Sequence, residues 1–344
     1  MTSIAPTAPR ATSRPLPRHG MRRDVVALAL ACIAVFILFT WSLATGTASL
    51  SLIDLVRGTA DADQIRTFAL SRLPRTLAVV LAGASMAMAG LIMQMLVRNR
   101  YVEPSTTGVT ESASLGILVV TIVAPQASVV AKMSVAIVAA LAGTLLLLAL
   151  IRALPHRDLI VVPLIGILLT GIIGAGVSAL AWKFQLQGTV AAWSTGDFSG
   201  IIKGRYELLW IVAITGIIAY LLADAFTVLA LGDGLAANLG LRLGQVRAAG
   251  LAIVAVVAGV TTVVAGALPF LGLVVPNVVS LLVGDYLRRC LPFVAVGGAG
   301  FVLIADILAR TIVAPAEIPV GTVMGVLGGA VFVIFLLTRT GVRQ

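Results

Sequence analysis

Residues 248–284, AAGLAIVAVVAGVTTVVAGALPFLGLVVPNVVSLLVG, decide the fold. This run of 37 residues contains no Asp, Glu, Lys or Arg. As one helix it would be about 56 Å long, nearly twice the thickness of the hydrocarbon layer of a membrane. Gly266, Pro269, Gly272 and Pro276 interrupt the run, and residues of these types break or bend helices. The sequence therefore predicts two membrane spans with a bend between them.

Eight further runs of at least sixteen residues lack charged side chains. They are Val25 to Ile53, Thr76 to Val97, Ser112 to Ala131, Met133 to Ile151, Leu159 to Trp182, Leu208 to Ala223, Cys290 to Ala305 and Ile318 to Thr338. A helix needs about 20 apolar residues to cross the hydrocarbon layer. Together with the two halves of the long run, these segments predict an all-α polytopic membrane protein with ten transmembrane helices.

The composition agrees with a membrane protein and excludes several other classes. Of the 344 residues, 60% are hydrophobic and 11% are charged, and the mean hydropathy is +1.10. Soluble domains carry roughly 25% charged residues, so a water-soluble enzyme, a disordered chain and a disulfide-rich secreted domain are excluded. The formal net charge of +10 is therefore interpreted as a sign of membrane topology rather than of nucleic-acid binding.

The basic residues predict the orientation of the chain. In a ten-span arrangement with both ends on one side, that side receives fifteen of the 24 Lys and Arg residues. By the positive-inside rule this side is cytoplasmic, so both termini are expected in the cytoplasm. Residues 1–23, rich in Pro, Ser, Thr and Arg, are predicted to be a disordered cytoplasmic tail. Residues 24–340 are predicted to be the ten-helix transmembrane domain.

The chain offers few groups for catalysis or metal binding. It has no G-x-x-x-x-G-K-[ST] phosphate loop, so it cannot hydrolyse ATP by that route. His19 and His156 lack a second ligand at metal-binding spacing, and Cys32 and Cys290 show no ligand-like spacing. We therefore expect no catalytic residue, no resident metal and no cofactor.

One carboxylate, Asp306, lies clearly within an apolar run. Ionisable residues inside a membrane span are functional candidates by default. Arg310 follows four residues later, a spacing that allows an ion pair on one helical face. The sequence thus predicts a structural ion pair near the outer end of the ninth span, with a functional role for Asp306 as the alternative.

A series of collinear motifs between residues 25 and 340 resembles one protein family. The motifs are SRLPRTL at 71–77 with Gln94 and RNRYVEP at 98–104; Gly108 with Leu115-Gly116; Trp193 with Gly196; ALG at 230–232 with Leu239-Gly240; FLGLVVP at 270–276; Ala305-Asp306 with Ala309-Arg310; and PAEIPVG at 315–321. This pattern is similar to that of the FecCD-type permease subunits of ABC importers for ferric siderophores and vitamin B12.

The resemblance implies a ten-helix bundle like that of the vitamin B12 importer permease, in the inner membrane. It also implies three kinds of protein partner: a second permease subunit (identical or paralogous), two cytoplasmic ATP-binding subunits, and an external substrate-binding protein. The implied substrate is a ferric siderophore. The missing phosphate loop is compatible with hydrolysis on another chain. The scarcity of oxygen ligands suits iron that is already wrapped in a chelator, because a bare hard cation would need such ligands along its path.

The resemblance assigns a docking role to Arg72, Arg75 and Arg310. In the family, arginines at the matching positions sit at the external mouth and receive carboxylates from the two lobes of the binding protein. Guanidinium groups suit this role because they bind carboxylates through two parallel hydrogen bonds. The alternative is that these three residues are ordinary arginines of a membrane interface.

The cytoplasmic stretch 224–247 has leucines at every fourth position, Leu231, Leu235, Leu239 and Leu243, with glycines between them. This pattern predicts two short amphipathic helices joined by a turn. By resemblance, the stretch is the coupling loop that docks into the ATPase; a surface helix lying on the lipid is the alternative. The expected ATPase-coupling residues are Leu231, Gly232, Asp233, Leu235, Ala236, Leu239, Gly240 and Leu241.

The translocation path is expected between two permeases, lined mainly by the fifth and tenth spans, with the Trp193 segment near the outer side. Polar side chains on these helices are candidates for contact with the substrate. The candidate path residues are Gln94, Thr170, Ser178, Trp193 and Thr322.

The resemblance predicts a permease subunit that translocates a ferric siderophore across the inner membrane, powered by a separate ATPase. Asn277, where many members carry a histidine, and residues 103–108 with 268–270 favour the siderophore branch. Vitamin B12 or haem import is the alternative within the family. Two alternatives from other classes are a proton-driven secondary carrier and an integral-membrane lipid-phosphate enzyme. Such an enzyme would need a cluster of acidic, His or Arg residues on one side of the membrane, which the sequence lacks.

Overall fold

The computed structural model describes residues 20–46, 57, 59, 61–153 and 161–340. These residues form helices and no strand, which confirms the all-α prediction. In chain order the helices are α1 (Gly20–Ala44), α3 (Ala62–Thr67), η1 (Phe68–Arg72), α4 (Leu73–Val97), η2 (Pro104–Thr106), α5 (Val109–Val123), α6 (Val129–Ala153), α7 (Val161–Lys183), α8 (Gln187–Thr195), η3 (Tyr206–Leu208), α9 (Leu209–Leu221), α10 (Ala223–Ala230), α11 (Asp233–Asn238), α12 (Leu243–Val264), α13 (Leu271–Val283), α14 (Leu287–Thr311) and α15 (Val320–Thr340). Of the predicted tail, residues 1–19 lie outside the described residues, and α1 already begins at Gly20.

Helices of full membrane length account for only part of the ten predicted spans. Among the described residues, six helices are long and apolar enough to cross a membrane. The segments Tyr206–Leu221 and Ala223–Ala230 meet at an angle of 60°, and together they would form a seventh span. α5, α13 and the described apolar part of α15 are shorter. Each of the ten predicted segments therefore contains a helix, but the count of ten crossings is not confirmed.

The long uncharged run divides into two helices, as predicted. α12 ends at Val264 and α13 begins at Leu271. Between them, Gly266 and Phe270 have φ angles of 82° and 62°, left-handed conformations that end a helix. α13 has 13 residues, so it is about 20 Å long and spans only part of a hydrocarbon layer of about 30 Å. Its first residues are buried inside the protein.

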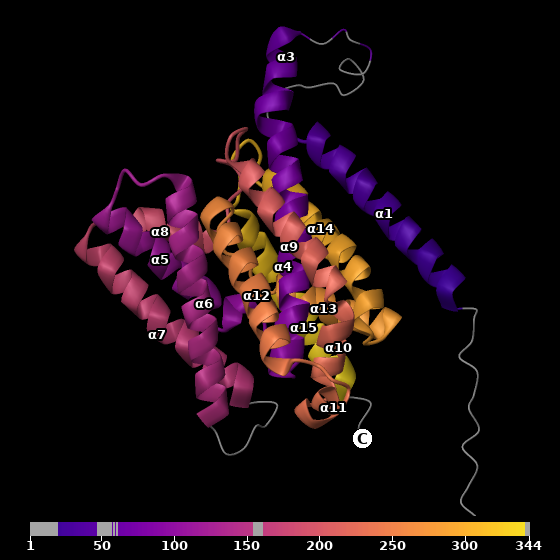
Figure 1. Ribbon diagram of the computed structural model, residues 1–344. Helices are drawn as coiled ribbons and strands as arrows, with labels where there is room; N and C mark the ends of the chain where they lie inside the picture. The colour runs from indigo at the N-terminus through magenta and orange to yellow at the C-terminus, as the bar shows by residue number, and fades with distance from the viewer. Residues whose placement is uncertain (1–19, 47–56, 58, 60, 154–160, 341–344) are drawn as a thin grey trace, which may run out of the picture.

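α4 is the centre of the helical bundle. It packs against α14, α13, α12 and α9, and α1 lies on the outside against α14 (Figure 1). α5, α6, α7 and α8 form a lobe on one side, which joins the bundle through contacts of α5 and α6 with α12. The structure therefore consists of a central bundle and one lateral lobe.

Glycines allow α4 to approach its neighbours closely. A Cβ atom on Gly83 would lie 2.7 Å from the carbonyl oxygen of Gly298 in α14. A Cβ atom on Gly90 would lie 2.2 Å from the Cα atom of Gly272 in α13. No side chain fits at these distances, and close backbone packing of this kind holds helices together in membranes.

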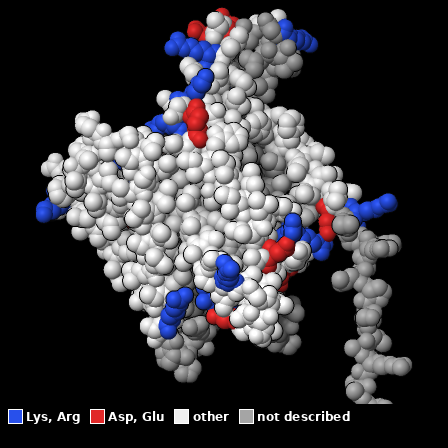
Figure 2. All heavy atoms as spheres, viewed as in Figure 1, with Lys and Arg blue, Asp and Glu red and all other residues white. Residues whose placement is uncertain are grey.

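Charged side chains gather at the two ends of the molecule. Figure 2 shows them above and below a middle zone that is almost uncharged on this face. The upper end in Figure 1 carries α3 and the end of α1, and the lower end carries α11. α1 begins at the lower end, where Asp24 pairs with Arg289 at 2.5 Å. The uncharged zone is the part of the surface that suits the hydrocarbon layer.

Candidate functional site

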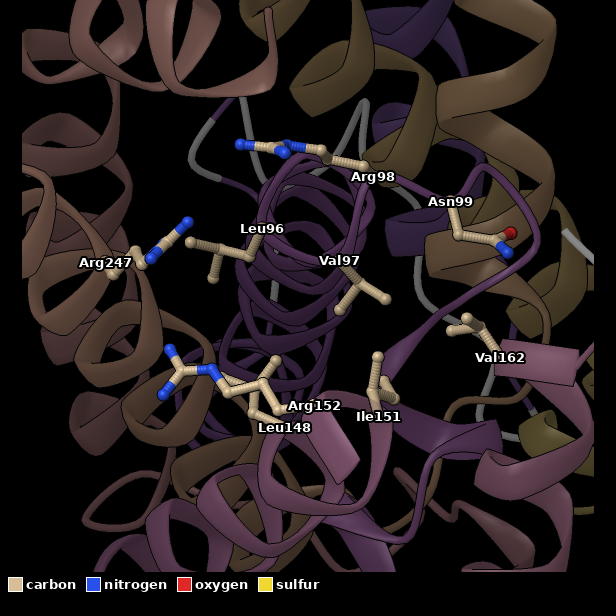
Figure 3. Close-up of a pocket in the computed structure, with 9 residues that line it drawn as sticks. All are labelled: Leu96, Val97, Arg98, Asn99, Leu148, Ile151, Arg152, Val162 and Arg247. Carbon is tan, nitrogen blue, oxygen red and sulfur yellow. The ribbon is translucent and has the colours of Figure 1, made fainter. Parts of the chain in front are cut away.

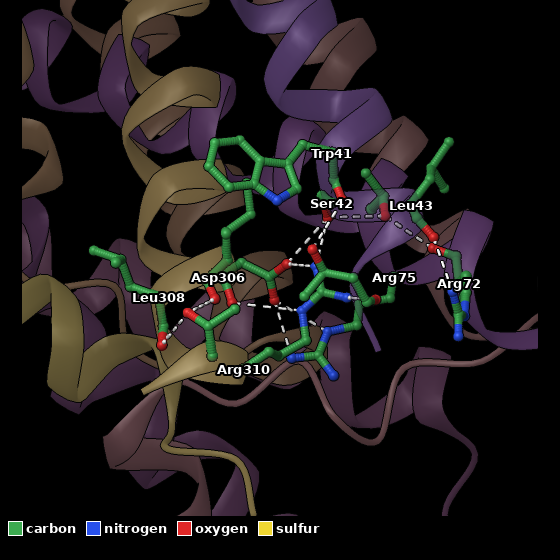
Figure 4. A network of polar contacts seen from close by, with 12 residues as sticks. Trp41, Ser42, Leu43, Arg72, Arg75, Asp306, Leu308 and Arg310 are labelled. Carbon is green, nitrogen blue, oxygen red and sulfur yellow. Dashed lines mark hydrogen bonds and ion pairs between the residues drawn. The ribbon is translucent and has the colours of Figure 1, made fainter. Parts of the chain in front are cut away.

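At the upper end, a buried ion-pair network joins α4 to α14 (Figure 4). Asp306 in α14 has no exposed surface. Its Oδ1 accepts hydrogen bonds from Nε and Nη2 of Arg75 at 3.1 and 3.0 Å, and its Oδ2 pairs with Arg310 one helical turn later. The structure thus forms the Asp306–Arg310 pair that the spacing predicts and adds Arg75 as a second partner.

Three further residues complete what we call the upper cluster. Glu317, which follows α14, accepts a hydrogen bond from Nη1 of Arg75 at 2.7 Å. Ser42 of α1 accepts one from Nη2 of Arg310 at 2.6 Å. Arg72 donates to a carbonyl oxygen at the end of α1 at 3.1 Å. The upper cluster is therefore Ser42, Arg72, Arg75, Asp306, Arg310 and Glu317.

All three arginines with a predicted docking role belong to the upper cluster. Arg72, Arg75 and Arg310 are 7%, 8% and 8% exposed. Asp306 pairs with Arg75 and Arg310, and Glu317 pairs with Arg75. The Asp306 side chain has no exposed surface, whereas 30% of the Glu317 side chain is exposed. The structure therefore brings the three arginines together and gives them partners within the chain. The sequence does not indicate that Glu317 is one of these partners.

At the lower end, the coupling loop forms two short helices, α10 and α11, as predicted. Gly232 and Gly240, at the two ends of α11, have φ angles of 126° and 77°, which glycine adopts without steric cost. Leu231, Leu235 and Leu239 are 62%, 58% and 68% exposed. The loop therefore presents a row of leucines that no described part of the chain covers.

Asp233 fixes the coupling loop to two long helices. It pairs with Arg98 at the end of α4 and with Arg247 of α12, the latter at 2.6 Å. The hydrogen bonds from Arg247 and Arg98 hold the pKa of Asp233 below its usual value, so the carboxylate is ionised near neutral pH. Ala236 is fully buried, which anchors the opposite face of α11. α11 is therefore linked to both α4 and α12.

Three of the five candidate path residues lie on α7 and α15, helices with one face that no other described part of the chain covers. Ser178 of α7 and Thr322 of α15 are exposed. The hydroxyl oxygen of Thr170 in α7 is buried and has no hydrogen-bond partner among the described residues. A Cβ atom added at Gly171 or Gly176 of α7 would meet nothing within 4 Å. α7 therefore exposes small and weakly polar residues together with large apolar ones such as Ile172, which is 71% exposed.

The other two candidate path residues, Gln94 and Trp193, make contacts within the chain. Gln94 is 5% exposed, and its side chain donates to the carbonyl oxygen of Gly272 at 3.0 Å. The carbonyl oxygen of Trp193 in α8 accepts a hydrogen bond from the backbone N–H of Ala267 at 2.9 Å. Both residues thus support the turn between α12 and α13 and the start of α13.

Glu103 is a residue whose role was missed in the sequence. It is 1% exposed, and its Oε1 accepts hydrogen bonds from the backbone N–H of Phe270 at 2.9 Å and from the hydroxyl of Ser105 at 2.6 Å. The carboxylate therefore lies at the N-terminal end of α13, where the helix dipole favours negative charge. The signal in the sequence is an acidic residue in the otherwise uncharged segment 101–108.

Comparison with known proteins identifies the family. A model of the FecCD transport family matches residues 33–339. The chain belongs to the FecCD transport family. This confirms the resemblance inferred from the motifs. A FecCD chain is a multi-pass membrane permease and not an enzyme, so the lipid-phosphate enzyme alternative is wrong.

Two petrobactin permeases are similar to this FecCD chain over most of their length. The petrobactin import system permease of Bacillus subtilis is 41% identical over 89% of this chain and 96% of its own. That of Bacillus anthracis is 39% identical over 92% of both chains. The vitamin B12 import permease of Serratia proteamaculans is 34% identical over 94% of both chains. The two petrobactin permeases therefore match at higher identity than the vitamin B12 permease.

A solved structure shares the fold of this FecCD chain. A metal-chelate type ABC transporter in an inward-facing conformation superimposes with a TM-score of 0.77 over 91% of this chain and 99% of its own. Its sequence is 23% identical. The likeness shows that the helical bundle with its short helices is an ABC importer permease fold.

The upper cluster yields a prediction about stability. Asp306→Asn removes the fully buried carboxylate and leaves Arg75 and Arg310 facing each other. Breaking a buried ion pair by removing one partner costs about 3–5 kcal/mol, so we expect the free energy of unfolding to fall by about that amount. The measurement is thermal unfolding of the purified chain in detergent, followed by tryptophan fluorescence.

The matched control is Asp285→Asn at the lower end. Asp285 pairs with Arg100 at 2.6 Å, but both side chains are about half exposed, and exposed pairs contribute about 0–1 kcal/mol. An equal loss of stability in the two variants would contradict the role of Asp306 as the buried centre of the upper cluster.

Proposed function

We propose that this FecCD chain is the permease subunit of an ABC importer that carries a ferric siderophore across the inner membrane. ATP hydrolysed on a separate subunit drives the transport. The observation that carries the proposal is the higher identity to petrobactin permeases, over nearly their whole length, than to a vitamin B12 permease. Vitamin B12 or haem import is the second candidate, because permeases for both substrates match at lower identity.

The coupling loop is the proposed contact with the ATPase. A row of exposed leucines on a short helix suits a groove in a partner protein. Leu231, Leu235 and Leu239 supply that row, and Gly232, Ala236, Gly240 and Leu241 shape the helix behind it. Asp233 links α11 to α4 and α12. In this mechanism, closure of two ATP-binding subunits pulls on α11 and moves the two long helices.

The upper cluster is the proposed contact with an external substrate-binding protein. Its three guanidinium groups lie together at one end of the molecule, and guanidinium groups bind carboxylates through paired hydrogen bonds. The partly exposed Glu317 already holds Arg75 in the geometry that a carboxylate of the binding protein would need. Docking thus adds a carboxylate beside Arg72 or replaces Glu317 on Arg75.

The proposed path lies between this chain and a second permease, identical or paralogous. α7 and α15 expose Ser178, Thr322 and several glycines that meet no other part of the described chain. A weakly polar lining suits a bulky chelate, since tight binding along the path would slow its passage. Trp193 and Gln94 contribute indirectly, because they support the turn before α13 and its first residues.

The proposed orientation places the lower end in the cytoplasm. The arginines at the ends of α4 and α6 and at the start of α14 lie at this end, which follows the positive-inside rule. α1 begins there and α15 ends there (Figure 1). Both termini would then be cytoplasmic, on the same side as the ATPase.

The substrate can be tested in reconstituted vesicles. The chain, an ATPase subunit and a binding protein are assembled in vesicles that contain ATP, and uptake of ferric petrobactin, cobalamin and hemin is compared. We expect ATP-dependent uptake of the ferric siderophore only. Accumulation without ATP that collapses with the proton gradient would indicate a secondary carrier, and preferential cobalamin uptake would support the second candidate.

The coupling loop can be tested with Gly240→Pro. Gly240 has a φ of 77° and donates its N–H to the carbonyl oxygen of Ala237 at 2.9 Å. Proline fixes φ near −65° and has no N–H, so we expect α11 to lose its position and uptake to be abolished in a folded protein. Gly244→Ala is the control, since a Cβ atom there meets nothing within 4 Å. Normal uptake by Gly240→Pro would refute the role of the loop.

The docking role can be tested with Arg72→Glu. We expect the Kd for the binding protein to rise about tenfold, equivalent to about 1.4 kcal/mol, because two carboxylates would then face each other. Lys132→Glu makes the same charge change at the upper end of the lateral lobe and should leave the Kd unchanged. The measurement is binding of the substrate-binding protein to the importer in nanodiscs. Equal affinities for both variants would remove Arg72 from the docking surface.

A further inference from the structure

A cavity of about 260 Å³ lies at the lower end, between the central bundle and the lateral lobe. It is formed where α4 and α6 end and where α7 and α12 begin. Its lining residues are Leu96, Val97, Arg98, Asn99, Leu148, Ile151, Arg152, Val162 and Arg247. The substrate path, the upper cluster and the leucine row of the coupling loop do not include this cavity.

Three arginines converge on one side of the cavity. Figure 3 shows the guanidinium groups of Arg98, Arg152 and Arg247 on that side, with Val97 and Ile151 on the opposite side. Asp233 accepts hydrogen bonds from Arg98 and Arg247. Arg152 has no ion-pair partner among the described residues. Two positive charges at this site are therefore uncompensated within the described chain.

The opposite side of the cavity and its surroundings are apolar. Ile151 and Val162 are 6% and 4% exposed and form part of the hydrophobic core. On the face of α6 that carries Arg152, Val138 and Leu145 are 66% and 50% exposed; they precede Arg152 by fourteen and seven residues, a spacing that places them on its side of the helix. A ligand at this place would therefore meet cations at one end and apolar surface along the rest.

We propose that this cavity binds the phosphate-bearing headgroup of an anionic phospholipid. Basic pockets between transmembrane helices at the cytoplasmic surface bind such headgroups, and guanidinium groups bind phosphate oxygens through paired hydrogen bonds. Arg98, Arg152 and Arg247 hold the phosphate, and the acyl chains follow the exposed Leu145 and Val138 of α6. The inference is independent of the siderophore, because it concerns lipid binding by the permease alone.

A lipid fits the site better than a free phosphate ion does. A free ion would be held by the arginines but would leave the apolar wall formed by Val97, Ile151 and Val162 without a partner. The site also lies at the lower end of the helices, where α4 and α6 end and α7 and α12 begin, and headgroups lie at the ends of membrane-spanning helices. Because Arg98 and Arg247 also hold Asp233, a bound headgroup lies against the supports of the coupling loop.

The test measures binding of short-chain lipids to the full chain in detergent. Dioctanoyl phosphatidylglycerol is titrated while Tm is followed, and the rise in Tm gives an apparent Kd. Dioctanoyl phosphatidylcholine and inorganic phosphate are titrated at the same ionic strength. We expect Tm to rise with phosphatidylglycerol only, and Arg152→Gln to weaken this binding about fivefold, since each basic residue near a membrane surface contributes about that factor.

Two further variants separate the cavity from general charge attraction. Leu148→Trp fills the cavity and keeps all its charges, so it should abolish the phosphatidylglycerol effect. Arg23→Gln removes an exposed arginine at the same end and should leave the apparent Kd unchanged. An equal response to phosphatidylcholine, an equal response to inorganic phosphate, or an unchanged Kd in both Arg152→Gln and Leu148→Trp would overturn the proposal.

Discussion

The structure depends on satisfying the backbone groups at the break between α12 and α13. Inside a membrane, an unpaired N–H or carbonyl group costs several kcal/mol, so an interrupted helix persists only if the protein supplies partners. Here Glu103 accepts from the N–H of Phe270, the side chain of Gln94 donates to the carbonyl oxygen of Gly272, and Trp193 accepts from Ala267. These partners come from three separate segments of the chain. The break therefore ties the segment after α4, α4 itself and α8 to one point in the bundle.

α4 connects this point to both candidate functional ends. At the upper end, Arg75 in its first turn binds the buried Asp306, and along its length glycine contacts hold it against α14 and α13. At the lower end, Arg98 at its C-terminal end binds Asp233 of the coupling loop. α4 is therefore a continuous physical connection between the two ends of the molecule, which coupling between them would need. The proposed docking and coupling events would thus act on the same helix.

Much of the fold follows from local patterns in the sequence, whereas the partners of the buried polar groups do not. Gly266 and Pro269 mark the break in the long run, and the four-residue spacing of Asp306 and Arg310 predicts their ion pair. The Arg75–Asp306 contact joins residues 231 positions apart, so no local spacing indicates it. Gln94 illustrates the same limit, because a polar residue in an apolar helix indicates a partner but not its direction. Hydropathy likewise measures the length of an apolar run and not the length of the helix within it, so it does not show that α13 has only 13 residues.

The two carboxylates of the upper cluster have different consequences for the proposed docking. Asp306 is fully buried between two guanidinium groups, and moving it would take away the carboxylate that pairs with Arg310 and leave Arg75 with Glu317 alone, at a cost of several kcal/mol. Glu317 lies outside the helices and keeps 30% of its side chain in solvent, so its exchange for another carboxylate costs less than the loss of the fully buried Asp306. Asp306 therefore fixes the direction of Arg75 and Arg310, while Glu317 can leave. A partner's carboxylate would meet a guanidinium group that is already oriented, which reduces the entropy lost on binding.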